Sequence, residues 1–135
     1  MAHPALPLQK AIYKALSEDE AITEVVTDRI YDHLPEDAQF PYICLADDAY
    51  SRDRWFHECY VTVQAFTEGE GMVDVKALAS LVDECLTRQL IVEDFDTVEY
   101  AGESIEFYRD PKAGNQMAEL ELRYLLEPQL VWYDE

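Results

Sequence analysis

The chain has 135 residues and a mass of 15.6 kDa, and its 10 Lys and Arg against 29 Asp and Glu give a formal net charge of −19. Because 49% of the residues are hydrophobic, the chain can still build a core, which excludes an acidic disordered tail. The shortage of cations also argues against a protein that binds nucleic-acid phosphates or an anionic membrane surface. We expect one domain over residues 1–128 and a short C-terminal tail over 129–135.

The sequence shows no segment that would direct the chain out of the cytoplasm. No stretch approaches about 18 consecutive apolar residues, and the first residues lack the basic and apolar pattern of a signal peptide. The chain has three cysteines, an odd number at wide spacing: Cys44, Cys59 and Cys85. We therefore predict three reduced core thiols, a chain made in the cytoplasm and no membrane association.

The first third of the chain predicts two helices. Apolar residues recur at helical spacing over 5–16, which indicates the first helix. The run from Ser17 to Glu20 has the form of a capping box, with Ser17 as the N-cap of a short second helix. The apolar stripe of that helix consists of Ala21, Ile22, Val25 and Val26.

The next segments predict strands. Residues 29–33 form a short β-prone run, and residues 40–46 are apolar on both faces, as in a central strand. Residues 47–54 are polar and predict a connection. Residues 57–66 then alternate, which places Cys59, Val61, Val63 and Ala65 on one face.

The second half of the chain continues this pattern. Residues 72–89 predict a helix, and residues 97–108 predict a strand with a bulge or bend at Gly102. A turn over 110–115 leads to a strand over 117–126, whose apolar face carries Ala118, Leu120, Leu122, Tyr124 and Leu126. We predict an α+β fold: a mainly antiparallel sheet of about four to five strands, with helices packed on one face.

The sequence contains no catalytic or cofactor motif. His3, His33, His57 and the three cysteines form no close ligand pair, and no phosphate-binding loop or nucleophile elbow is present. The acidic runs at Glu93–Asp96 and Asp47–Asp48 suit either a divalent cation or solvated loops. We therefore expect no metal, no cofactor and no enzymatic activity.

Charge and aromatic residues give the remaining signals. No Lys or Arg lies between Arg88 and Arg109, a segment that contains Glu93, Asp94, Asp96, Glu99, Glu103 and Glu106. This block predicts one strongly negative face. Trp55 and Phe56 lie in a polar segment, either as an exposed anchor for another subunit or folded back on the core.

The order of these segments resembles a known family. The leading helix is followed by residues 29–43, which read RIYDHLPEDAQFPYI, then by Arg109-Asp110-Pro111 and a last strand that ends RYLLE over 123–127. This pattern, over about residues 5–127, is similar to the tail-completion, or tail-terminator, family of long-tailed bacteriophages and gene transfer agents. The resemblance implies a structural virion protein without catalytic residues, whose hexameric ring ends tail-tube polymerisation and faces the head–tail connector.

The resemblance gives the acidic block and the aromatic residues a role. We expect a homo-oligomer, a hexamer, in the virion tail that contacts the tail tube protein and the head–tail connector protein. DNA would pass through a lumen lined by Glu93, Asp94, Asp96, Glu99, Glu103 and Glu106 without specific binding, and Trp55, Phe56, Tyr31 and Arg109 would lie at subunit interfaces. A head–tail connector or neck protein of the same particle is the alternative.

Overall fold

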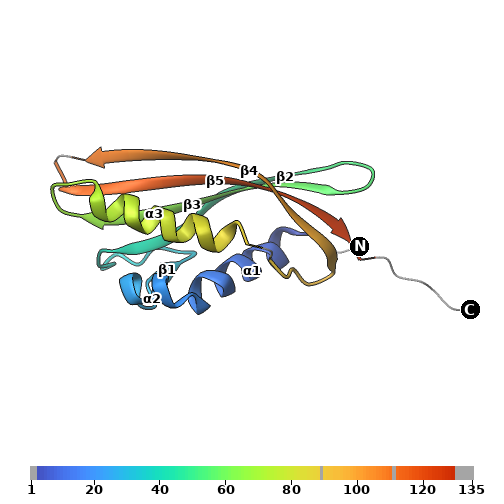
Figure 1. The fold of residues 1–135 in the computed structure, drawn as a ribbon, viewed down its shortest axis with the longest axis horizontal. Coiled ribbons are helices and arrows are strands. Elements are labelled where there is room, and N and C mark those ends of the chain that lie inside the picture. Colours follow the sequence, from blue (N-terminus) through green and yellow to red (C-terminus); the bar gives the residue numbers. More distant parts are fainter. Residues whose placement is uncertain (1–2, 89, 111, 130–135) are drawn as a thin grey trace, which may run out of the picture.

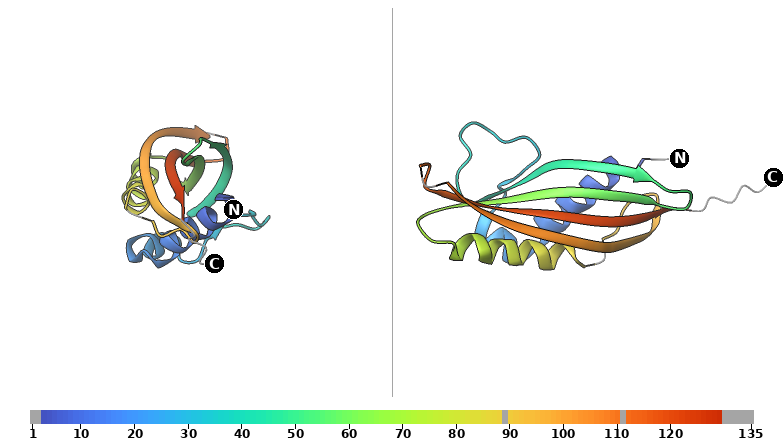
Figure 2. Two further views of the ribbon diagram at one scale, coloured as in Figure 1. Left: turned by 90° about the vertical axis from the view of Figure 1, so that its right-hand side faces the viewer. Right: turned by 90° about the horizontal axis from the view of Figure 1, so that it is seen from above.

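A curled, five-stranded sheet with three helices on one face forms the protein (Figures 1 and 2). The computed structural model describes residues 3–88, 90–110 and 112–129. The elements are α1 (Ala5–Glu18), α2 (Glu20–Val26), β1 (Ile30–Tyr31), β2 (Tyr42–Arg52), β3 (His57–Glu68), α3 (Val73–Leu86), β4 (Phe95–Asp110) and β5 (Asn115–Pro128). The strand order is β1-β2-β3-β5-β4, and only the short β1–β2 pair is parallel. The predicted α+β fold is confirmed.

The helices bury the apolar stripes that the sequence shows. In α1, Leu8, Ile12 and Leu16 follow one another at four-residue spacing and are buried in the hydrophobic core. The prediction of Ser17 as the cap of α2 is wrong, because Ser17 belongs to α1. Asp19 is the N-cap instead, and its Oδ1 accepts a hydrogen bond of 3.1 Å from the Ile22 N–H.

The central pair β3–β5 confirms the predicted alternation. Twelve residues of β3 pair in unbroken register with β5, from His57 opposite Leu126 to Glu68 opposite Asn115. The inward residues of both strands are buried beneath the helices. This pair therefore supplies most of the sheet's share of the hydrophobic core.

The prediction for residues 40–54 needs correction. Residues 47–52 are not a connection but continue β2, which pairs with β3 as far as Arg52 opposite His57. β2 is also not a fully central strand, because β1 pairs only with Ile43 and Cys44. The polar residues here are compatible with a strand because Asp47 and Asp48 are exposed, beside an irregularity in the register.

The predicted irregularity at Gly102 is confirmed and has a consequence for the facing of β4. The register with β5 shifts between Tyr100 and Gly102, and Gly102 has a φ of +147°, which disfavours any residue with a Cβ. Before the shift Tyr100 faces the helices; after it Glu103 and Ile105 do, since they lie opposite the inward Leu122 and Leu120. Within the described residues, no strand pairs with the outer edge of β4.

Candidate functional site: a concave acidic sheet face

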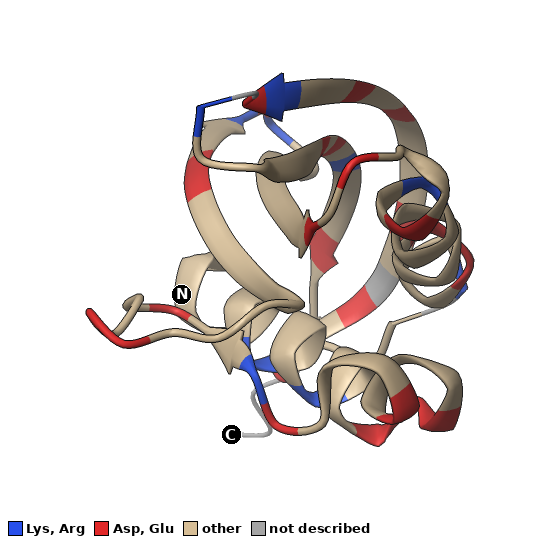
Figure 3. Cartoon of the chain, turned by 90° about the vertical axis from the view of Figure 1, so that its left-hand side faces the viewer, with Lys and Arg blue, Asp and Glu red and all other residues tan. Residues whose placement is uncertain are grey.

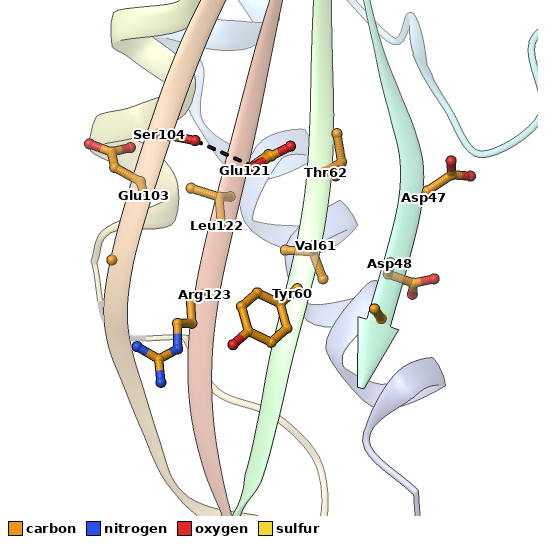
Figure 4. Close-up of a pocket in the computed structure, with 12 residues that line it drawn as sticks. Asp47, Asp48, Tyr60, Val61, Thr62, Glu103, Ser104, Glu121, Leu122 and Arg123 are labelled. Atoms are coloured by element: carbon orange, nitrogen blue, oxygen red, sulfur yellow. Dashed lines mark hydrogen bonds between the residues drawn. The ribbon is translucent and has the colours of Figure 1, made fainter. Parts of the chain in front are cut away.

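The face of the sheet that lies away from the helices is hollowed into an open trough of about 410 Å³. We call this face the trough. Its side chains come from four strands: Ala49, Tyr60, Thr62, Ser104, Glu121 and Arg123 (Figure 4). β2 and β4 can both line it because the sheet curls along its whole width (Figure 2). The shape follows from the twist of long antiparallel strands.

Carboxylates dominate the trough. Glu119 and Glu121 of β5 lie opposite Glu106 and Ser104 of β4, on the face away from the helices. Like charges on opposed residues cost stability, so the Glu106–Glu119 pair is not explained by the needs of the fold. The chain as a whole has 29 Asp and Glu against 10 Lys and Arg, and in Figure 3 the red acidic positions are spread over helices, strands and loops.

Neutral donors orient these carboxylates without cancelling their charge. Gln64 Nε2 donates to Glu119 at 3.1 Å, and Ser104 Oγ donates to Glu121 at 3.4 Å (Figure 4). The Tyr108 hydroxyl donates to Glu106. The trough therefore presents oriented negative charge on the face away from the helices.

Arg123 is the one cation among the described trough-facing residues of β3, β4 and β5, and it is already paired. Its Nε and Nη2 each lie 2.7 Å from Glu58 Oε1, which also accepts a hydrogen bond from the Tyr60 hydroxyl. These hydrogen bonds from Tyr60 and Arg123 lower the pKa of Glu58 below its usual value. The carboxylate thus stays ionised and neutralises the guanidinium.

The structure does not bring the six predicted acidic residues onto one face. Glu99 and Glu106 lie on the trough side of β4, whereas Glu103 lies on the helix side. Glu93 and Asp94 precede β4, and Asp96 lies at its beginning; all six are exposed. Glu58, Glu119 and Glu121 are not among the residues predicted from the sequence as members of the acidic face. The alternation of β5 already placed the last two on the face opposite its apolar residues.

The four predicted interface residues lie in different environments. Trp55, in the turn between β2 and β3, is 70% exposed, and Phe56 beside it is half-buried. Arg109 is exposed near the end of β4. The ring of Tyr31 instead packs edge-on against Tyr42, with centroids 6.0 Å apart. None of the four is held by another of them.

The described residues offer little for covalent or metal chemistry. Cys59 and Cys85 are buried, and burial raises their pKa values to about 12 and about 11, so neither thiol is activated. Cys44 is only partly buried, in contrast to the predicted core position. Over residues 3–88, 90–110 and 112–129, no group of three His, Cys, Asp or Glu is placed to hold a metal ion. No described helix is long and apolar enough to cross a membrane.

Solved structures and a family model match this chain. One structure, titled "Virion of native gene transfer agent (GTA) particle", is similar with a TM-score of 0.79 at 21% identity, over 94% of this chain and 99% of that one. The gp17 protein of bacteriophage SPP1 is similar with a TM-score of 0.66 at 18% identity, over 94% of each chain. No curated protein matches at a significant level. The family model described as "Tail completion protein gp17" matches residues 10–127, and the chain therefore belongs to this family of phage tail-completion proteins.

Proposed function

We propose that this protein caps the tail tube, ends its polymerisation and forms the tail-side joint to the head, as a hexameric ring through which DNA passes. Membership of the tail-completion family supports a structural role in a virion. The acidic trough supports the passage of DNA through a ring. A concave face with oriented carboxylates and a neutralised arginine suits the wall of a channel for a polyanion.

The charge of the trough gives a physical reason for DNA to pass without binding. Phosphates are repelled by Glu106, Glu119 and Glu121 over about 8 Å at physiological salt, the distance beyond which screening removes the effect. A free arginine would retain DNA by charge-assisted hydrogen bonds, but Arg123 is paired with Glu58. In this proposal Glu99 and Glu106 keep the lumen role expected for the acidic block, and Glu58, Glu119 and Glu121 join them.

The ring would contact the tail tube protein on one side and the head–tail connector protein on the other. Six chains of net charge −19 repel one another, so their interfaces need apolar and ion-paired contacts. The exposed Trp55 and the neighbouring Phe56 can supply apolar area, and Arg109 can supply a cation. The assembled protein would reside in the virion tail.

Tails assembled with and without this protein test the proposal in negative-stain images. Without it, we expect tubes of uncontrolled length. Tubes of normal length that lack heads would overturn termination in favour of the connector role. Light scattering after size-exclusion chromatography should give a particle near six times 15.6 kDa for the ring.

Charge reversal tests the lumen. We expect Glu119→Lys with Glu121→Lys to slow DNA release from the particles, because the trough then attracts phosphates. Glu20→Lys with Glu24→Lys reverses two exposed carboxylates on α2, on the helix side of the sheet, and serves as the matched control. Equal DNA release in all three particles would overturn the lumen assignment and leave termination standing.

A further inference from the structure

We propose that the tip of the β2–β3 hairpin of one copy docks into a groove at the beginning of β4 of a second copy. The tip consists of residues 53–56, and we call it the arm. The inference rests on the proposed ring and adds to it a specific contact between neighbouring copies. It follows from three observations: the exposed side chains of the arm, the residues that line the groove, and the strand register that places both at one end of the molecule.

The arm presents an aromatic ring and a cation together. Trp55 is 70% exposed, and the guanidinium of Arg54 lies 5.1 Å from the centre of its ring. The turn is held by a 2.9 Å hydrogen bond from the Asp53 N–H to the Phe56 carbonyl. An exposed tryptophan on an ordered hairpin is the kind of residue that dominates the energy of an interface.

The groove lies between the end of α3 and β4 and has a volume of about 360 Å³. Its apolar lining is Leu90, Val98, Tyr100 and Tyr124, and its rim carries Glu99 and Arg88. Arg88 lies 3.7 Å from Asp19, which offsets its charge. Glu93, Asp94 and Asp96 are exposed next to the groove along the chain, so its surroundings are negative.

The sheet places the arm and the groove at the same level. One row of paired residues crosses the sheet from Arg52 through His57 and Leu126 to Val98. The arm extends just past this row at the β2 edge, and the groove lies at this row at the β4 edge. In Figure 1 the hairpin tip and the beginning of β4 are both at the end of the molecule near the N-terminus.

Both sheet edges are available for a second copy. In the described part of the chain nothing pairs with the outer edge of β4, and β1 covers β2 only at Ile43 and Cys44. β2 and β4 run in opposite directions, so β2 of one copy can extend the sheet of the next by antiparallel pairing. When the rows stay level, Trp55 reaches the apolar groove and Arg54 reaches its acidic surroundings.

Charge complementarity favours a second copy as the occupant. The groove is surrounded by carboxylates, and the arm carries Arg54 beside Trp55, directly after Arg52 and Asp53, so this end of the hairpin is net positive in a chain with only 10 Lys and Arg. An edge of one copy that fits the opposite edge of the next is a heterologous contact, which repeats until the ring closes. The contact thereby gives the acidic residues at the beginning of β4 a role at the interface.

Intermolecular cross-linking tests the contact. Trp55→Cys protein is mixed with Val98→Cys protein under mild oxidation, and the full chain carrying both changes is treated in parallel. We expect a disulfide-linked dimer in the mixture and a ladder up to the hexamer for the double variant. Trp55→Cys with Val25→Cys, on exposed α2, is the matched control, and the wild type measures any background from native cysteines.

Association measurements separate this contact from the ring itself. Trp55→Ala should raise the concentration needed for assembly about thirtyfold, as for an interface hot spot, whereas Val25→Ala should leave it unchanged. Arg54→Glu should weaken assembly, and adding Asp96→Arg should restore it, because Arg54 comes level with Asp96 when Arg52 is level with Val98. The arm contact alone would be overturned if the wild type forms a ring, the Cys variants give no 55–98 cross-link, and Trp55→Ala assembles like the wild type. A chain that neither assembles nor cross-links would overturn the contact and the ring together.

Discussion

Glu103 of β4 lies beside Asp83 of α3, and the two carboxyl groups meet on the helix side of the sheet. Interaction with the Asp83 carboxyl group and burial raise the pKa of Glu103 to about 7 from an ordinary value of 4.5. Oδ1 of Asp83 is buried and has no hydrogen-bond partner among the described residues. The pair can therefore hold one proton near neutral pH and link α3 to β4.

Stability should depend on pH through this pair. Because the folded protein binds the Glu103 proton more tightly than the unfolded chain, its contribution is complete below pH 4.5 and is lost as the pH rises through about 7. We expect Glu103→Gln to flatten this part of the curve of unfolding free energy against pH. Urea denaturation across this range measures it, with Glu106→Gln as the control. An unchanged slope in Glu103→Gln would show that the two carboxyl groups do not share a proton.

Removing the partner of Arg123 should make the trough bind DNA. In Glu58→Gln the guanidinium loses its carboxylate and becomes available to phosphates. We expect this variant to be retained on immobilised DNA at low salt and released at high salt, while the wild type flows through. The double change Glu58→Gln with Arg123→Gln should flow through again. Retention that persists in the double variant would place the binding outside this pair.

The bulge at Gly102 should be sensitive to a single methyl group. Gly102 has a φ of +147°, so Gly102→Ala strains the backbone although nothing lies within 4 Å of the added Cβ. We expect a loss of about 1–3 kcal/mol in the free energy of unfolding, measured by thermal or urea denaturation. Gly71→Ala is the matched control, since its surroundings are equally open and its φ is not in the strained region. Equal stability of the two variants would contradict the backbone strain expected at position 102.

The core should not accept a charge at Leu120. This side chain is fully buried between β5 and the helices, so Leu120→Ala should lose about 2–5 kcal/mol of unfolding free energy. Leu120→Asp should abolish folding, because a carboxylate there has no partner. Leu81→Asp should lower the free energy of unfolding less than Leu120→Asp does, since Leu81 is only partly buried. Circular dichroism measures all three, and Leu6→Asp, at a site that is 59% exposed, is the control.

The sequence by itself determined the class of fold and the family. Apolar residues in α1 and α3 recur at helical spacing, and those in β3 and β5 alternate, so local periodicity decided both the type of element and its buried face. Gly102 interrupted a clear alternation and was identifiable as a bulge for the same reason. The cap of α2 was missed because Ser17 and Asp19 are both good N-caps, and packing of α1 decided between them.

Only the tertiary structure decided which acidic residues share a surface. Charge counted along the chain put Glu103 with Glu99 and Glu106, but the bulge turns Glu103 toward α3. Glu58 of β3 lies more than 50 residues before Glu119 and Glu121 of β5 in sequence, and only strand register puts the three on one face. The same pairing continued β2 through the polar residues 47–52 and put the Trp55 arm level with the beginning of β4. The net charge of −19 follows from composition alone. The arrangement of acidic residues along a trough depends on long-range strand pairing, which local periodicity does not encode.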